Sequence, residues 1–110
     1  CKFYCEGANM PTTNDALNYL IENMIAVGSA KAANAGGVAC SCIEMGQNAG
    51  HTVYQHQAVY DQLHDIMRNI YKNSAAAAEK YFGNKNLLVQ GGNIAGFEKV
   101  AAAMMEQGLV

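Results

Sequence analysis

The sequence predicts an α/β fold in which short parallel strands are joined by helices. Two runs of β-branched and aromatic residues, Phe3-Tyr4-Cys5 and Ile25 with Val27, each lead into a turn of small residues. A segment with apolar residues at the helical period of 3.6 follows each run. The order strand, helix, strand, helix favours right-handed crossover connections between parallel strands.

The first strand is predicted over Phe3-Tyr4-Cys5 and stops before Pro11. Thr12 and Asp15 have the spacing of a capping box, so a helix is expected over residues 13–22. The apolar residues of this segment recur on one helical face, which we expect to pack on the sheet: Ala16, Leu17, Leu20, Ile21 and Met24.

The second strand leads into a loop of small residues, and a helix is predicted to begin at Val38. Glycines at such a turn let a ligand approach the backbone, and the free N–H groups of the helix favour an anion. Glycine between strand and helix serves packing just as often, so both interpretations stay open. Asn34 and Ser41 supply hydrogen-bonding side chains around this turn.

Two asparagines follow the predicted strands, Asn9 after the first and Asn34 after the second. The carboxyl ends of parallel strands meet at one edge of a sheet, and open parallel sheets bind ligands there. We therefore expect both asparagines at the ligand-binding edge.

The second half of the chain is predicted to be mainly helical. A long helix is expected from about Gln55 to Gly83, and its alanine run at residues 75–78 would let another helix approach closely. Residues 87–90 are expected to be extended, followed by a glycine-rich lead-in to a last helix that ends at Gly108. The apolar face of this last helix consists of Ile94, Phe97, Val100, Ala101, Met104 and Met105.

Composition excludes several classes of function. The net charge is −2 and there is no run of Lys or Arg, so neither nucleic acid nor an anionic membrane is an expected partner. No apolar run approaches the roughly 20 residues of a transmembrane helix. The chain begins at Cys1 with a strand directly after it, which favours a piece cut from a longer protein.

The cysteines do not predict a metal site. Cys1, Cys5, Cys40 and Cys42 lack the spacing of zinc ligands, and the three histidines form no matching pair. Four reduced and mostly buried cysteines are expected instead, which is typical of a cytoplasmic protein.

Three motifs in register carry a resemblance to one family. Residues 6–13 (EGANMPTT), residues 31–38 (KAANAGGV) with 44–48 (EMGQN), and residues 92–97 (GNIAGF) with 103–108 (AMMEQG) resemble the C-terminal quarter of glutamate dehydrogenase. The similarity is greatest to the small-subunit hexameric enzymes of the Glu/Leu/Phe/Val dehydrogenase family. It implies that residues 1–90 end a Rossmann-like NAD(P)-binding domain, and that residues 91–110 form a helix returning to a substrate domain.

The resemblance also implies a function and its residues. The family interconverts L-glutamate with 2-oxoglutarate and ammonia, using NADP or NAD. Asn9 and Asn34 match coenzyme-binding positions, by the nicotinamide ribose and at the nicotinamide end of the cleft. Val38 and Ser41 match the substrate pocket, where the serine hydroxyl binds the γ-carboxylate.

The matched residues include no catalytic residue, because the family's catalytic lysine and aspartate belong upstream of residue 1. The chain alone is therefore expected to be inactive. NADP is favoured over NAD, and a homohexamer is implied. Two alternatives stay open: a branched-chain or aromatic amino-acid dehydrogenase of the same family, and a non-catalytic helical interaction module. Ser41 argues against the former, because an apolar pocket has no use for its hydroxyl.

Overall fold

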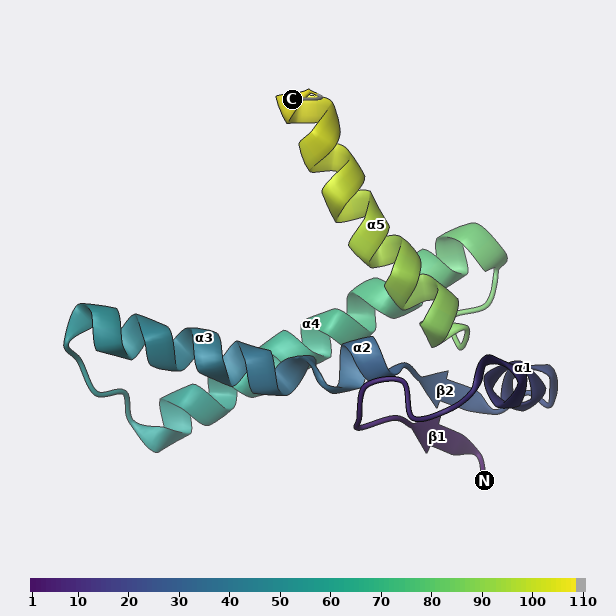
Figure 1. Cartoon of the computed structure of the whole chain (residues 1–110), viewed down its shortest axis with the longest axis horizontal. Helices are drawn as coiled ribbons and strands as arrows, with labels where there is room; N and C mark the ends of the chain where they lie inside the picture. The colour runs from purple at the N-terminus through teal and green to yellow at the C-terminus, as the bar shows by residue number, and fades with distance from the viewer. Residues whose placement is uncertain (109–110) are drawn as a thin grey trace.

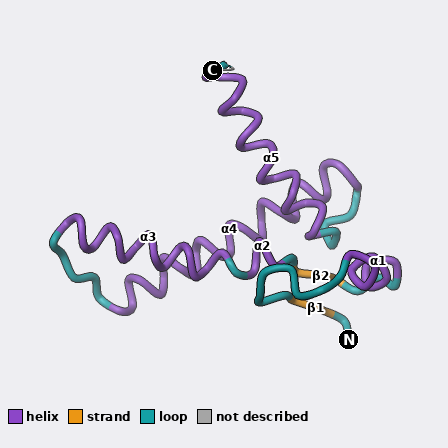
Figure 2. The backbone as a smooth tube through the Cα atoms, viewed as in Figure 1, coloured by secondary structure: helices purple, strands orange, loops and turns teal. Residues whose placement is uncertain are grey.

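The computed structural model describes residues 1–108 and has a small parallel sheet beside long helices (Figures 1 and 2). This arrangement confirms the α/β prediction. In chain order the elements are β1 (Phe3–Cys5), α1 (Asn14–Glu22), β2 (Ala26–Gly28), α2 (Ala30–Ala33), α3 (Ala35–Gly50), α4 (His56–Phe82) and α5 (Leu88–Gln107).

The sheet consists of β1 and β2, which run parallel with Tyr4 opposite Val27. Val27 is 1% exposed and is the largest side chain that residues 1–108 bury completely. Helix α1 connects the two strands and contacts β2, as the crossover prediction requires. β1 and β2 therefore end at the same edge of the sheet.

The start of α1 differs from the capping-box prediction. Thr13 is the N-cap, and its Oγ1 accepts a hydrogen bond from the Ala16 amide at 3.4 Å. The hydroxyl of Thr12 instead lies 2.8 Å from that of Tyr4, so Thr12 ties the loop to β1. Of the predicted packing face, Leu17, Leu20 and Ile21 are half-buried, whereas Ala16 is exposed and Met24, beyond the helix end, is 91% exposed.

The prediction that a helix begins at Val38 is wrong. The chain turns helical at Ala30, and Gly36 and Gly37, which the prediction placed in a loop, lie inside α3. A Cβ atom at Gly36 would lie 3.5 Å from Sδ of Met67 and 3.6 Å from Cδ1 of Leu63 on α4. These are ordinary contact distances, so Gly36 faces α4 at a position where a small side chain would also fit. Helices α3 and α4 form the arm seen in Figure 1.

The prediction of an extended segment at residues 87–90 is also wrong, because α5 begins at Leu88. Packing explains the helix: α5 crosses α4 with the buried Gly91 against Ser74 and Ala78. A Cβ atom at Gly91 would lie 2.1 Å from the carbonyl oxygen of Ser74. The alanine run of α4 allows this approach, as predicted, and Ala77 and Ala78 are buried.

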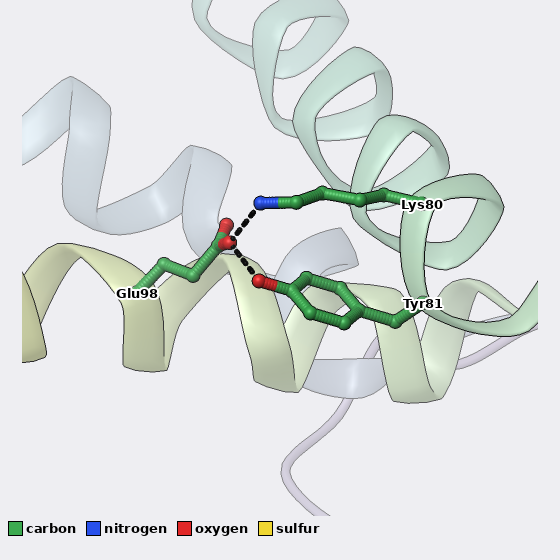
Figure 3. A network of polar contacts seen from close by, with 3 residues as sticks. All are labelled: Lys80, Tyr81 and Glu98. Atoms are coloured by element: carbon green, nitrogen blue, oxygen red, sulfur yellow. Dashed lines mark hydrogen bonds and ion pairs between the residues drawn. The ribbon is translucent and has the colours of Figure 1, made fainter.

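A polar cluster joins α4 to α5 on the surface (Figure 3). Oε1 of Glu98 accepts hydrogen bonds from Nζ of Lys80 at 2.8 Å and from the hydroxyl of Tyr81 at 2.5 Å. Both donors favour the ionised carboxyl, so the pKa of Glu98 lies below its ordinary value. The ion-paired side chains are 63% and 41% exposed, so their pairing adds little to stability, and Gly91 packing dominates this joint.

The buried apolar core of residues 1–108 is small and consists of Val27, Ala30, Ala77 and Ala78. The C-terminal half of α5 projects away from it (Figure 1). Four residues of its predicted apolar face are between 50% and 86% exposed: Phe97, Val100, Met104 and Met105. α5 ends with Gly108 as its C-cap, as predicted. Within residues 1–108, every helix is too short or too polar to cross a membrane.

Candidate functional site

The two strand-end asparagines meet. Asn9 lies in the loop after β1, and Asn34 stands between α2 and α3. Nδ2 of Asn34 donates a hydrogen bond to Oδ1 of Asn9. The sequence-based expectation that both residues lie at one edge of the parallel sheet is therefore confirmed.

The predicted substrate residues lie on α3, next to this pair. Asn34, Val38 and Ser41 are spaced by four and three positions, so they share one face of the helix. Val38 is 68% exposed, and Ser41 is also exposed. A Cβ atom at Gly37 would meet no atom within 4 Å, so this face is open to a ligand.

The hydroxyl of Ser41 donates a hydrogen bond to the carbonyl oxygen of Gly37 at 3.1 Å, within its own helix. The Gly37 carbonyl also takes part in the backbone hydrogen bonding of α3, so the serine hydroxyl can rotate away from it toward a ligand at small cost in free energy. An exposed hydroxyl of this kind can donate to an incoming carboxylate.

Sequence reasoning missed Glu6. This residue is 6% exposed, and its Oε2 accepts a hydrogen bond from the Ala30 amide at 2.9 Å. Ser29, the N-cap of α2, makes no side-chain capping bond, so Glu6 caps α2 from another element. The acidic residue after the first strand would have predicted a cap for α2 only if the start of α2 at Ala30 had been known.

A second polar link joins α2 to α5. Nζ of Lys31 donates a hydrogen bond to Oδ1 of Asn93 at 3.2 Å. A groove of about 240 Å³ runs beside it between α2, α4 and α5. Mostly small residues line the groove, including Ala32, Ala35, Ser74, Gly92 and Ala95.

The cysteines are free, but the expectation that most are buried is wrong. Cys1, Cys5 and Cys42 are exposed, and Cys40 is half-buried. The small core of residues 1–108 leaves little interior for them. In the same part of the chain, no three His, Cys, Asp or Glu side chains gather where they could hold a metal ion.

Comparison with known proteins decides the family. Residues 1–108 match the sequence pattern of the Glutamate/Leucine/Phenylalanine/Valine dehydrogenase family. The chain belongs to this family. Because the match covers nearly the whole chain, it includes Asn9, Asn34, Val38 and Ser41.

Several dehydrogenases of the family are closely similar to the chain. An NADP-specific glutamate dehydrogenase from Helicobacter pylori is 46% identical over 99% of the chain. An NAD-specific glutamate dehydrogenase from Clostridium symbiosum is 50% identical over 98% of the chain. The chain spans 24% of the length of each of these relatives.

The structure agrees with a solved member of the family. The crystal structure of Plasmodium falciparum glutamate dehydrogenase superposes with a TM-score of 0.95 at 47% sequence identity. The match covers 100% of the chain and 24% of the solved chain. The chain therefore has the fold of the corresponding segment of this dehydrogenase, as the resemblance predicted.

Proposed function

We propose that the chain forms the C-terminal quarter of an NAD(P)-dependent glutamate dehydrogenase. Such an enzyme interconverts L-glutamate with 2-oxoglutarate and ammonia. The two glutamate dehydrogenases compared above are 46% and 50% identical to the chain over nearly all of its length. The main structural support is the pairing of Asn9 with Asn34 next to the exposed Ser41.

Asn9 and Asn34 are proposed to hold the nicotinamide end of the coenzyme. Each amide side chain offers donors and an acceptor, which suit ribose hydroxyls and a carboxamide. Because the two amides are already hydrogen-bonded to each other, little side-chain freedom is lost on binding. When bound, the coenzyme supplies the hydride chemistry.

Val38 and Ser41 are proposed to bind the substrate side chain. The exposed Val38 offers an apolar surface to the methylene groups of glutamate, and Ser41 donates to the γ-carboxylate. The pocket is then selective, because an apolar amino acid would leave the serine hydroxyl unpaired. This polarity favours glutamate over the branched-chain and aromatic substrates.

The rest of the enzyme is proposed to complete the site. The catalytic lysine and aspartate come from outside the matched residues, so the chain alone is expected to be inactive. Residues 1–90 would end the coenzyme domain, and residues 91–110 would return to the substrate domain. The exposed apolar face of α5 supports this, because such a face is unfavourable in water. A cytoplasmic homohexamer is the expected form, with NADP as its coenzyme.

The function is tested by steady-state assays of the full-length protein. We expect L-glutamate with NADP to give the highest kcat/KM among glutamate, leucine, phenylalanine and valine, each with NADP and NAD. A higher kcat/KM for leucine, phenylalanine or valine would assign the substrate to another branch of the family. A preference for NAD would change the proposed coenzyme and leave the proposed substrate unaffected.

A further inference from the structure

Glu6 lies near the start of both segments that carry the paired asparagines. Asn9 follows it by three residues in the loop after β1. The carboxylate of Glu6 also binds the amide of Ala30, which begins the segment that leads to Asn34. The backbone amide of Glu6 also donates to the carbonyl oxygen of Gly28 at 3.1 Å, which extends the pairing of β1 with β2. One residue therefore touches both segments that carry the asparagines.

The hydrogen bond between Glu6 and Ala30 fixes the position of the Ala30 backbone relative to Glu6, in addition to placing a negative charge at the start of α2. The carboxylate is buried and its partner is a backbone amide, so neither group can move without loss of the bond. α2 contains only four residues, and Asn34 follows it directly. The backbone amide of Asn34 donates to the carbonyl oxygen of Ala30 at 2.9 Å, so a shift of Ala30 is transmitted to Asn34 through a single helical turn.

We infer that Glu6 is a positioning residue for coenzyme binding: its carboxylate holds Ala30 at the distance that brings Asn34 against Asn9. The inference rests on the proposed function, in which these two amides bind the nicotinamide end of the coenzyme. It assigns Glu6 an effect on coenzyme affinity in addition to its effect on the stability of α2. The length of the side chain decides that affinity.

Two substitutions separate length from charge. Glu6→Gln keeps an acceptor oxygen at the same reach and loses the charge, whereas Glu6→Asp keeps the charge and is one methylene shorter. In the full-length dehydrogenase we expect Glu6→Asp to raise the Kd for NADPH about tenfold, and Glu6→Gln to leave it within about twofold. The measurement is a fluorescence titration of NADPH, with the thermal midpoint of each variant recorded alongside.

Matched controls accompany the titration. Glu98→Asp makes the same exchange in the carboxylate that binds Lys80 and Tyr81 and is expected to leave the Kd unchanged. Asn9→Ala and Asn34→Ala are expected to raise the Kd, since they remove the proposed contacts themselves. If Glu6→Asp does not fold, Glu6→Met replaces it, because methionine fills a similar volume without a strong acceptor, and the same tenfold rise is expected.

The outcomes are distinguishable. A wild-type Kd for Glu6→Asp, or an equal loss for Glu6→Gln, overturns the positioning role even where the thermal midpoint falls. If that happens while the asparagine variants bind weakly, only the inference about Glu6 fails. If both asparagine variants bind NADPH as the wild type does, the proposed coenzyme site itself is wrong.

Discussion

Replacing Ser41 with valine is expected to raise the KM for L-glutamate by about tenfold to a hundredfold, the effect of losing one hydrogen bond to a charged group. The KM for norvaline, which lacks the γ-carboxylate, should stay the same or fall. The side chain is exposed on α3 and its only hydrogen bond in residues 1–108 lies within its own helix, so its removal does not open a core cavity. The measurement is steady-state kinetics of the full-length enzyme on both amino acids.

Ser41→Thr is the matched control for this variant. Threonine and valine have the same shape, but threonine keeps the hydroxyl group, so Ser41→Thr should retain most of the preference for glutamate. If Ser41→Val uses glutamate as well as the wild type does, the γ-carboxylate binds elsewhere. If the threonine variant loses activity on both glutamate and norvaline, the β-branched shape of the side chain, and not the lost hydrogen bond, explains the effect of Ser41→Val.

Substitution of Gly91 by alanine is expected to have the largest effect on stability. The added Cβ would lie 2.1 Å from the carbonyl oxygen of Ser74, 2.8 Å from Cβ of Ala78 and 3.0 Å from its amide nitrogen. Two of these atoms belong to the backbone of α4, so the helices must separate. We expect a loss of about 3 kcal/mol or more in the free energy of unfolding, at the upper end of the cost of overpacking.

Gly96→Ala tests whether this loss comes from the helix crossing. It makes the same change five positions later in α5, where a Cβ atom would meet nothing within 4 Å. Alanine favours a helix by about 1 kcal/mol over glycine, so this variant should be as stable as the wild type or more so. Thermal denaturation of the full-length protein measures both. Equal midpoints for the two variants would contradict the close crossing of α4 and α5.

The sequence predicted those features that depend on local chemistry or on the direction of the strands. Gly83 ends α4 with φ of 65°, a conformation that glycine adopts readily. Parallel strands separated by a helix were enough to place Asn9 and Asn34 at one edge, although not to predict their hydrogen bond.

The errors arise where packing between distant segments overrides local preference. Glycine disfavours a helix, yet Gly91 lies inside α5, because only glycine lets α5 approach α4 so closely at this position. Gly36 lies inside α3, where it faces Leu63 and Met67 of α4. Glu6 was missed because its partner Ala30 lies 24 positions away and opens a helix that was not predicted. Both kinds of error concern contacts that no local pattern encodes.

The most direct measurement is a crystal structure of the full-length enzyme with L-glutamate and NADP bound. We predict that Oγ of Ser41 has left the Gly37 carbonyl and lies about 2.7 Å from a γ-carboxylate oxygen. The amides of Asn9 and Asn34 should contact the nicotinamide ribose or carboxamide. A γ-carboxylate bound away from α3, with Ser41 still hydrogen-bonded to Gly37, would contradict the proposed site.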